Sequence, residues 1–115
     1  MKDFILYRKF INSDRHTSIK GDGGNELYID MLTYIQGIRD DELLSKIKDE
    51  IEVWLEIGNT SYFVMAVNLI GDLKLVEFRE KLKAKKLKIL KKEIPNFYFP
   101  ECYMEFIDNA LKRMD

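Results

Sequence analysis

The chain has 115 residues, a net charge of −1 and a single cysteine. This length predicts one domain, residues 1–115, that buries roughly two-thirds of its unfolded surface. A hydrophobic content of 46% excludes a disordered tail. No apolar run reaches the roughly 18 residues of a membrane span, so we expect no membrane association. A lone cysteine closes no internal disulfide, and the charged N-terminus is unlike a signal peptide, so we expect a cytoplasmic protein.

Most of the chain has the apolar spacing of amphipathic helices. Met1–Asn12 fits one side of a helix, the interpretation we favour, although its residues also alternate as in a strand. Asn12–Asn25 is polar and glycine-rich, which predicts a loop. Its GDGG run at residues 21–24 lacks the lysine of a phosphate-binding loop and the ligand spacing of an EF-hand. Glu26–Ile38 then shows the apolar stripe of a helix.

The segment Asp40–Lys92 is expected to set the core. Asp40 can cap a long helix predicted over Asp41–Ile57, because its carboxylate can accept hydrogen bonds from first-turn amides. Ser61–Ile70 is almost wholly apolar, which predicts a helix enclosed by its two longer neighbours. We expect Gly71-Asp72 to end it.

A further long helix is expected from Leu75 onward. Its apolar stripe changes phase between Leu82 and Leu87, which predicts a kink near residues 84–86. Pro95 is expected to end this segment and Pro100 to open a last helix. The inward side of that last helix should hold Cys102, Phe106, Ile107, Ala110, Leu111 and Met114.

Residues 66–78, AVNLIGDLKLVEF, resemble the junction between successive HEAT-type helical repeats. The long helices begin near Asp41 and Leu75, 34 positions apart (75 − 41), a spacing within the range of helical repeats. The resemblance implies an all-α fold of five or six helices, stacked as antiparallel pairs in a right-handed superhelix. The pairs would be residues 1–38, 41–71 and 75–114. A plain irregular helical bundle is the alternative.

Residues for catalysis are not grouped in any familiar pattern. His16 lies alone in a polar loop, and Cys102 lies near the other end of the chain, so neither completes a zinc set or a nucleophile–base pair. Carboxylates are plentiful, but we place them on solvated helix faces, where nothing raises their pKa. We therefore expect no enzyme, no catalytic residue, no metal and no cofactor.

Charge is distributed unevenly along the chain. Asp22–Glu56 holds ten acids and three bases, whereas Asp72–Lys92 holds three acids and nine bases. The basic segment suggests nucleic-acid binding as an alternative function. The acidic remainder of the chain, and bases on more than one helix side, argue against it. The residues for this alternative would be Lys81, Lys83, Lys85, Lys86, Lys88, Lys91 and Lys92.

Protein recognition is the function we favour. The HEAT-like resemblance implies that the second helix of each pair lines an inner groove. The partner-binding residues there would be Asp30, Thr33, Tyr62, Asn68, Glu105, Asp108 and Asn109. In its size, expected cytoplasmic character, lack of catalytic residues and HEAT-like junction, the chain resembles bacterial immunity proteins of polymorphic or contact-dependent toxin systems. This implies that it binds a cognate toxin domain and blocks its active site. Many such toxins are basic nucleases, toward which the acidic segment would steer. A general protein-binding adaptor is the alternative.

Overall fold

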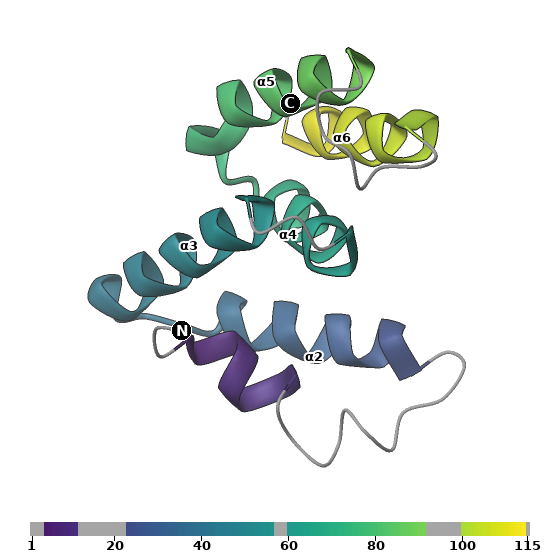
Figure 1. Cartoon of the computed structure of the whole chain (residues 1–115). Coiled ribbons are helices and arrows are strands. Elements are labelled where there is room, and N and C mark those ends of the chain that lie inside the picture. Colours follow the sequence, from purple (N-terminus) through teal and green to yellow (C-terminus); the bar gives the residue numbers. More distant parts are fainter. Residues whose placement is uncertain (1–3, 12–22, 57–59, 92–99, 115) are drawn as a thin grey trace. The chain divides into compact units, whose positions relative to one another are not determined.

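The computed structural model describes residues 4–11, 23–56, 60–91 and 100–114 (Figure 1). In order, its elements are η1 (Tyr7–Ile11), α2 (Gly23–Gln36), α3 (Asp41–Glu56), α4 (Thr60–Asp72), η2 (Val76–Phe78), α5 (Arg79–Leu90) and α6 (Pro100–Met114). No strand occurs in these ranges, which confirms the all-α fold. The chain divides into two compact units, residues 1–52 and 53–115. The single domain and the HEAT-like stacking stay predictions.

The first unit holds η1, α2 and most of α3. The N-terminal segment is helical from Ile5, so the favoured interpretation holds for its described residues. The loop expected over residues 12–25 is wrong at its end, because α2 already begins at Gly23; residues 12–22 lie outside the description. Buried residues on α2 recur at every fourth position as Leu27, Met31 and Ile35. The ring of Phe10 meets that of Tyr34 edge-on at 5.6 Å, which packs η1 against α2.

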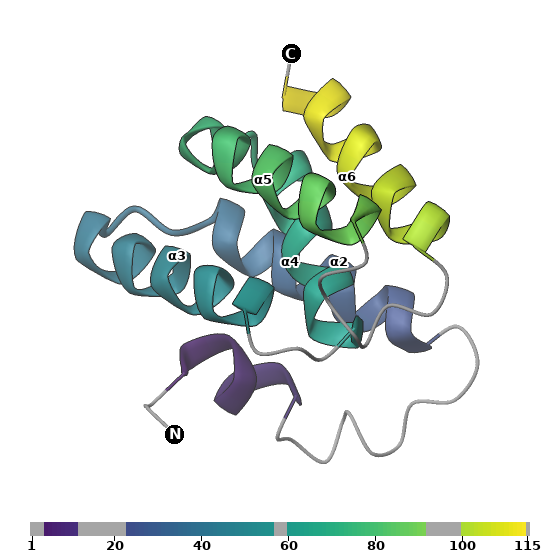
Figure 2. The ribbon, with the colours of Figure 1, turned by 45° about the horizontal axis from the view of Figure 1, so that its top comes forward.

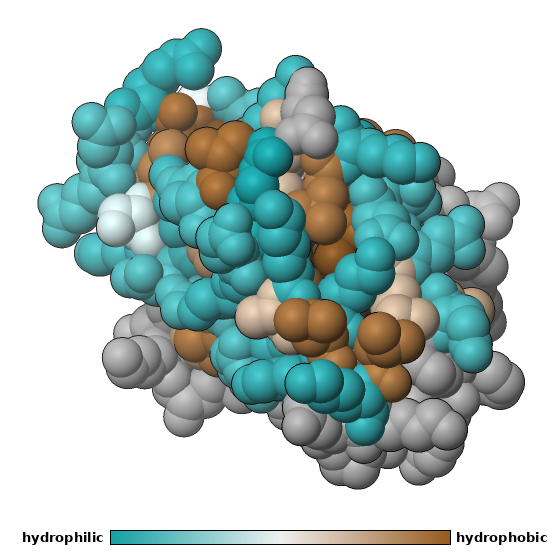
Figure 3. All heavy atoms as spheres, turned by 90° about the horizontal axis from the view of Figure 1, so that it is seen from above, coloured by the Kyte–Doolittle hydropathy of each residue, from teal (hydrophilic) through white to brown (hydrophobic). Residues whose placement is uncertain are grey.

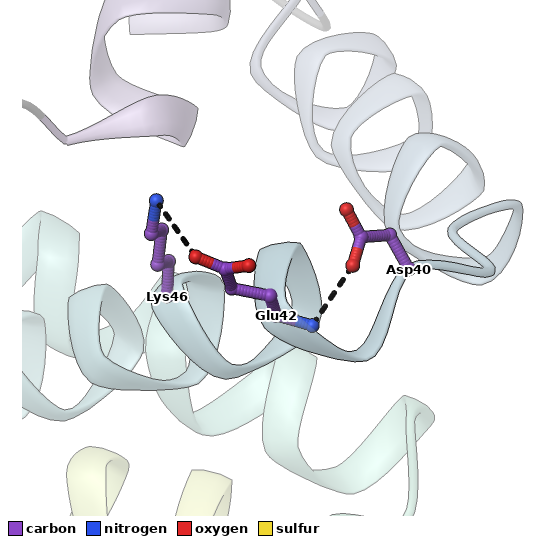
Figure 4. A network of polar contacts seen from close by, with 3 residues as sticks. All are labelled: Asp40, Glu42 and Lys46. Atoms are coloured by element: carbon purple, nitrogen blue, oxygen red, sulfur yellow. Dashed lines mark hydrogen bonds and ion pairs between the residues drawn. The ribbon is translucent and has the colours of Figure 1, made fainter.

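Helix α3 begins where its capping signal predicts. The Asp40 carboxylate accepts a hydrogen bond of 3.0 Å from the Glu42 amide (Figure 4). This bond satisfies one of the amides that a helix start leaves without a partner. One turn on, Glu42 forms an exposed ion pair of 3.8 Å with Lys46. On the opposite side, Ile47, Ile51 and Trp54 are buried, as the stripe predicts.

In the second unit, α4 is the buried helix. Six of its residues are buried, and Ser61 is exposed at its start. The buried helix is therefore confirmed, but its predicted surroundings are corrected. Within the second unit, the described helix that α4 mainly contacts is α6, far along the chain, rather than α5. The buried residues of α4 are Phe63, Ala66, Val67, Leu69, Ile70 and Gly71.

The end of α4 differs from the prediction. Gly71 and Asp72 stay in the helix, and the turn comes at Lys74, whose φ is 54°. The Leu75 amide donates to the Ile70 carbonyl at 3.0 Å and the Lys74 amide to the Gly71 carbonyl at 3.2 Å. These two bonds form a Schellman motif, in which a left-handed residue normally occupied by glycine closes the helix. The expectation that a glycine marks the end of this helix was misleading, because the left-handed position is occupied by a lysine.

Replacing Lys74 with glycine should raise the free energy of unfolding by about 0.5–1 kcal/mol. The reason is that a side chain at positive φ is strained, whereas glycine is not, and glycine's larger unfolded-state entropy offsets part of the gain. Urea unfolding followed by the fluorescence of Trp54, the single tryptophan, measures the change. Lys74→Ala is the control, since alanine keeps the strain and should bring no gain.

The kink expected near residues 84–86 is wrong. Helix α5 runs without interruption from Arg79 to Leu90, and the irregular turn lies before it, in η2. The buried residues of α5 are Leu82, Lys85 and Ile89. A lysine therefore continues the inward stripe, and no change of phase in the backbone is needed.

Helix α6 begins at Pro100, as predicted, and lies beside α5 in both ribbon views (Figures 1 and 2). It contacts both α4 and α5, so it organises the second unit. Its predicted inward side is right for Ile107, Ala110 and Met114, which are buried. The prediction that Cys102 lies on this inward side is wrong, because Cys102 is exposed. Pro95 lies outside the described residues.

Candidate interaction surfaces

Two charged side chains are buried within the described part of the chain, Glu50 and Lys85. Glu50, on α3, is only 2% exposed. Its two carboxylate oxygens accept hydrogen bonds from the amides of Leu6 and Tyr7, each at 2.8 Å. A side chain from α3 thus caps the first turn of the N-terminal helix. The expectation that carboxylates lie only on solvated faces is wrong at this position.

Burial raises the pKa of Glu50 above its ordinary value of 4.5, and the hydrogen bonds from the N-terminal amides oppose this rise. A raised pKa means that the folded protein holds this proton more tightly than the unfolded chain does. The contribution of Glu50 to stability is therefore fully present below about pH 4.5 and is lost as pH rises through the folded-state pKa.

We expect an NMR titration of the Glu50 carboxyl carbon to give a midpoint above 4.5. The difference in unfolding free energy between the unmodified protein and Glu50→Gln should shrink over the same pH window, because glutamine does not titrate. A midpoint at or below 4.5 would contradict the burial effect.

Lys85 and its neighbour Lys86 both form ion pairs within the second unit. The ammonium of Lys85 lies 2.7 Å from a carboxylate oxygen of Glu56, at the end of α3, while the stem of the side chain is buried. Lys86, the next residue, makes a 2.7 Å ion pair with Asp108 of α6. These two lysines therefore hold helices together within the second unit.

The lysines of the nucleic-acid alternative consequently fall into different classes. Lys85 and Lys86 have internal partners, and Lys83 lies 3.7 Å from Glu80 on its own helix. Lys88 and Lys91 are exposed, Lys81 is half-buried, and Lys92 is outside the described residues. Fewer cations are thus available to phosphates than the sequence suggested.

The residues predicted to bind a partner lie on α2 in the first unit and on α4 and α6 in the second. In the first unit, Asp30 is half-buried and Thr33 is exposed, both on α2. On α4, Tyr62 packs against Trp54 at 5.3 Å between ring centroids. Asn68, six residues later, lies about 120° away around the helix.

Asn68 and Asp108 serve contacts inside the second unit. The Asn68 side-chain oxygen accepts a hydrogen bond of 3.3 Å from Arg113, which also pairs with Asp72 at 3.2 Å. Asp108 is the partner of Lys86. Glu105 and Asn109 are exposed on α6. Of the predicted set in this unit, only these last two present their side chains mainly to solvent.

Sequence reasoning missed two apolar residues at the surface. Leu87 and Leu90 of α5 are 55% and 59% exposed. The predicted stripe places them toward the core, but Leu82, Lys85 and Ile89 occupy that side. Viewed from above, hydrophobic residues reach the surface among hydrophilic ones (Figure 3). The available signal was the phase change itself, since leucines out of phase with a buried stripe must point elsewhere.

The acidic surface of α3, from Asp40 to Asp49, is the second surface of interest. Asp40, Asp41, Glu42 and Asp49 are all exposed, and Lys46 is the exposed base among them. These carboxylates lie on a regular capped helix, so they present fixed negative charge to solvent. A surface of this sign attracts basic partners.

No protein-family model, curated protein or solved structure matches the chain. Among the residues that the structure describes, no three His, Cys, Asp or Glu side chains gather as metal ligands. None of the described helices is both long and apolar enough to cross a membrane. His16 lies outside the described ranges.

Proposed function

We propose that this protein is a cytoplasmic immunity protein that binds a cognate toxin domain and blocks its active site. The observation that carries the proposal is the acidic surface of α3, where Asp41 and Glu42 in the first turn and Asp49 two turns later are exposed on a capped helix. Such a surface accelerates association with a basic partner and orients it. A basic nuclease domain is a partner of this kind, and the protein would act as a binder without catalysis of its own.

Nucleic-acid binding through α5 is the weaker candidate. Lys85 and Lys86 already neutralise Glu56 and Asp108 at 2.7 Å each. Freeing them for phosphates would break ion pairs inside the second unit.

The test is co-expression with the protein encoded immediately upstream. The proposal expects a one-to-one complex by size-exclusion chromatography with light scattering, and survival of cells that the partner alone kills. No complex and no protection would refute it. A complex without loss of the partner's activity would favour a general adaptor instead.

A matched pair of variants tests the role of charge. Neutralising Asp41 and Asp49 together, as Asp41→Asn and Asp49→Asn, should slow association several-fold at low salt, because steering by exposed charge is lost. The effect should fade at about 0.5 M salt, where charges are screened within a few ångströms. Glu101→Gln with Glu77→Gln removes the same charge from two exposed acids outside α3 and should leave the rate unchanged. Equal effects from both variants would contradict a specific role for α3.

A further inference from the structure

The outward side of α5 combines apolar and basic side chains. Leu87 and Leu90 are three residues apart, and Lys83 and Lys91 each lie four residues from Leu87. Residues at these spacings share one side of a helix. All four are exposed. We call this set the outer face of α5.

The packing of α5 does not account for these leucines. The inward side holds Leu82, Lys85 and Ile89, and the Lys85 stem fills a position where a leucine would pack without needing an ion-pair partner. The helix thus carries a lysine inside and two leucines outside. Adjacent large apolar side chains more than half exposed are a feature of binding surfaces, whereas isolated ones are ordinary.

We propose that the outer face of α5 binds an acidic amphipathic segment of a partner protein, whose apolar residues cover Leu87 and Leu90. Charge complementarity selects this occupant, because Lys83 and Lys91 flank the leucines and Lys88 is exposed on the same helix. The ion pair of Lys83 with Glu80, at 3.7 Å and exposed, is weak enough to exchange for a partner's carboxylate. The outer face of α5 shares no residue with the acidic surface of α3, and its charge favours an acidic partner instead of a basic one.

Two other occupants fit less well. A second copy seated face to face through α5 would bring lysines against lysines, and like charges oppose such a contact. A membrane-binding helix needs a broad apolar face, usually with aromatic residues. Helix α5, REKLKAKKLKIL, has no aromatic residue, and its other large apolar residues, Leu82 and Ile89, are buried.

The experiment uses the full chain, labelled with nitrogen-15, and a synthetic helical peptide. The peptide carries leucines at positions i, i+3 and i+7 with glutamates beside them. At about 20 mM salt we expect amide shifts confined to residues 83–91 and a dissociation constant between about 10 µM and 1 mM. Raising the salt to about 300 mM should weaken binding several-fold, because the flanking charges are screened. A peptide with serines in place of the leucines should not bind.

The variant Leu87→Ser with Leu90→Ser should weaken peptide binding at least about tenfold, because the apolar anchors are lost. Both side chains are exposed, so the fold should persist, and the shift spectrum of α6 verifies this. Val76→Ser is the control, because Val76 is 56% exposed but lies in η2, before α5. Absence of binding at low salt, shifts mapped elsewhere, or full binding by the double variant would overturn the proposal. Tighter binding to vesicles of anionic phospholipid than to the peptide would also overturn it. No toxin is needed, so failure here is distinct from failure of the proposed immunity function.

Discussion

Replacing Glu50 with alanine is expected to lower the free energy of unfolding of the first unit by about 2–4 kcal/mol. The substitution leaves the amides of Leu6 and Tyr7 without their acceptors at 2.8 Å. Leaving a buried amide without a partner costs about 1–3 kcal/mol. Amide hydrogen exchange reports the effect directly, because protection of Leu6 and Tyr7 should fall more than protection of the α2 amides.

Two further variants separate capping from general damage to α3. Glu50→Gln keeps one acceptor oxygen but directs an amide group at a backbone donor, so its loss should be intermediate. Asp49→Ala changes the neighbouring exposed acid and should shift stability by less than about 0.5 kcal/mol. If the exchange of Leu6 and Tyr7 is the same in all three variants, Glu50 does not cap the N-terminal helix.

Apolar spacing was sufficient to place the helices. Four of the expected helices occur with ends shifted by only a few residues, and Asp40 caps α3 as its chemistry predicts. These features are local, since each depends on residues within one or two turns. The predicted end of α4 was wrong because Gly71 suggested a helix stop. This glycine is instead needed for close packing against α6. Contacts between helices far apart in sequence carry no such local signal.

The two buried charges share one spacing that was overlooked. Glu50 lies three residues after Ile47 and four before Trp54, and both neighbours are buried. Lys85 lies three residues after Leu82 and four before Ile89, again between buried residues. A charged residue at the centre of an i, i+3, i+7 set must be buried with its helix face.

The partners of these two buried charges could not be predicted from residue spacing. The sequence places Glu50 and Lys85 on buried faces, but it does not indicate that one meets the N-terminal amides and the other meets Glu56. The exposure of Leu87 and Leu90 could be inferred from Lys85. If this lysine faces inward, the leucines that are out of phase with it must face solvent. The outer face of α5 could thus have been predicted once Lys85 was assigned to the core.

Enlarging Gly71 should disrupt the contact between α4 and α6. A Cβ atom added there would lie 2.8 Å from the Ala110 Cα and 2.8 Å from the Arg113 guanidinium. The arginine end could move, at the expense of its bonds to Asp72 and Asn68, but the backbone of α6 could not move without shifting the helix. Overpacking of this kind typically costs about 1–3 kcal/mol, occasionally more.

We therefore expect Gly71→Leu to lower the unfolding free energy by about 3 kcal/mol. Gly71→Ala should lower the unfolding free energy by only about 1 kcal/mol. The better helix propensity of alanine, worth about 1 kcal/mol, offsets part of the clash. Trp54 fluorescence during urea unfolding measures both, since Trp54 belongs to the second unit.

Gly37→Ala is the matched control for this contact. Gly37 is exposed, and an added Cβ would meet only carbonyl oxygens of its own segment at 3.6 and 3.7 Å, which are ordinary distances. The same glycine-to-alanine change should therefore be neutral or raise stability by up to about 1 kcal/mol, through the unfolded state. If Gly71→Ala is as well tolerated as Gly37→Ala, then α4 and α6 do not approach as closely as the structure has them, and α6 would not be the helix that buries α4.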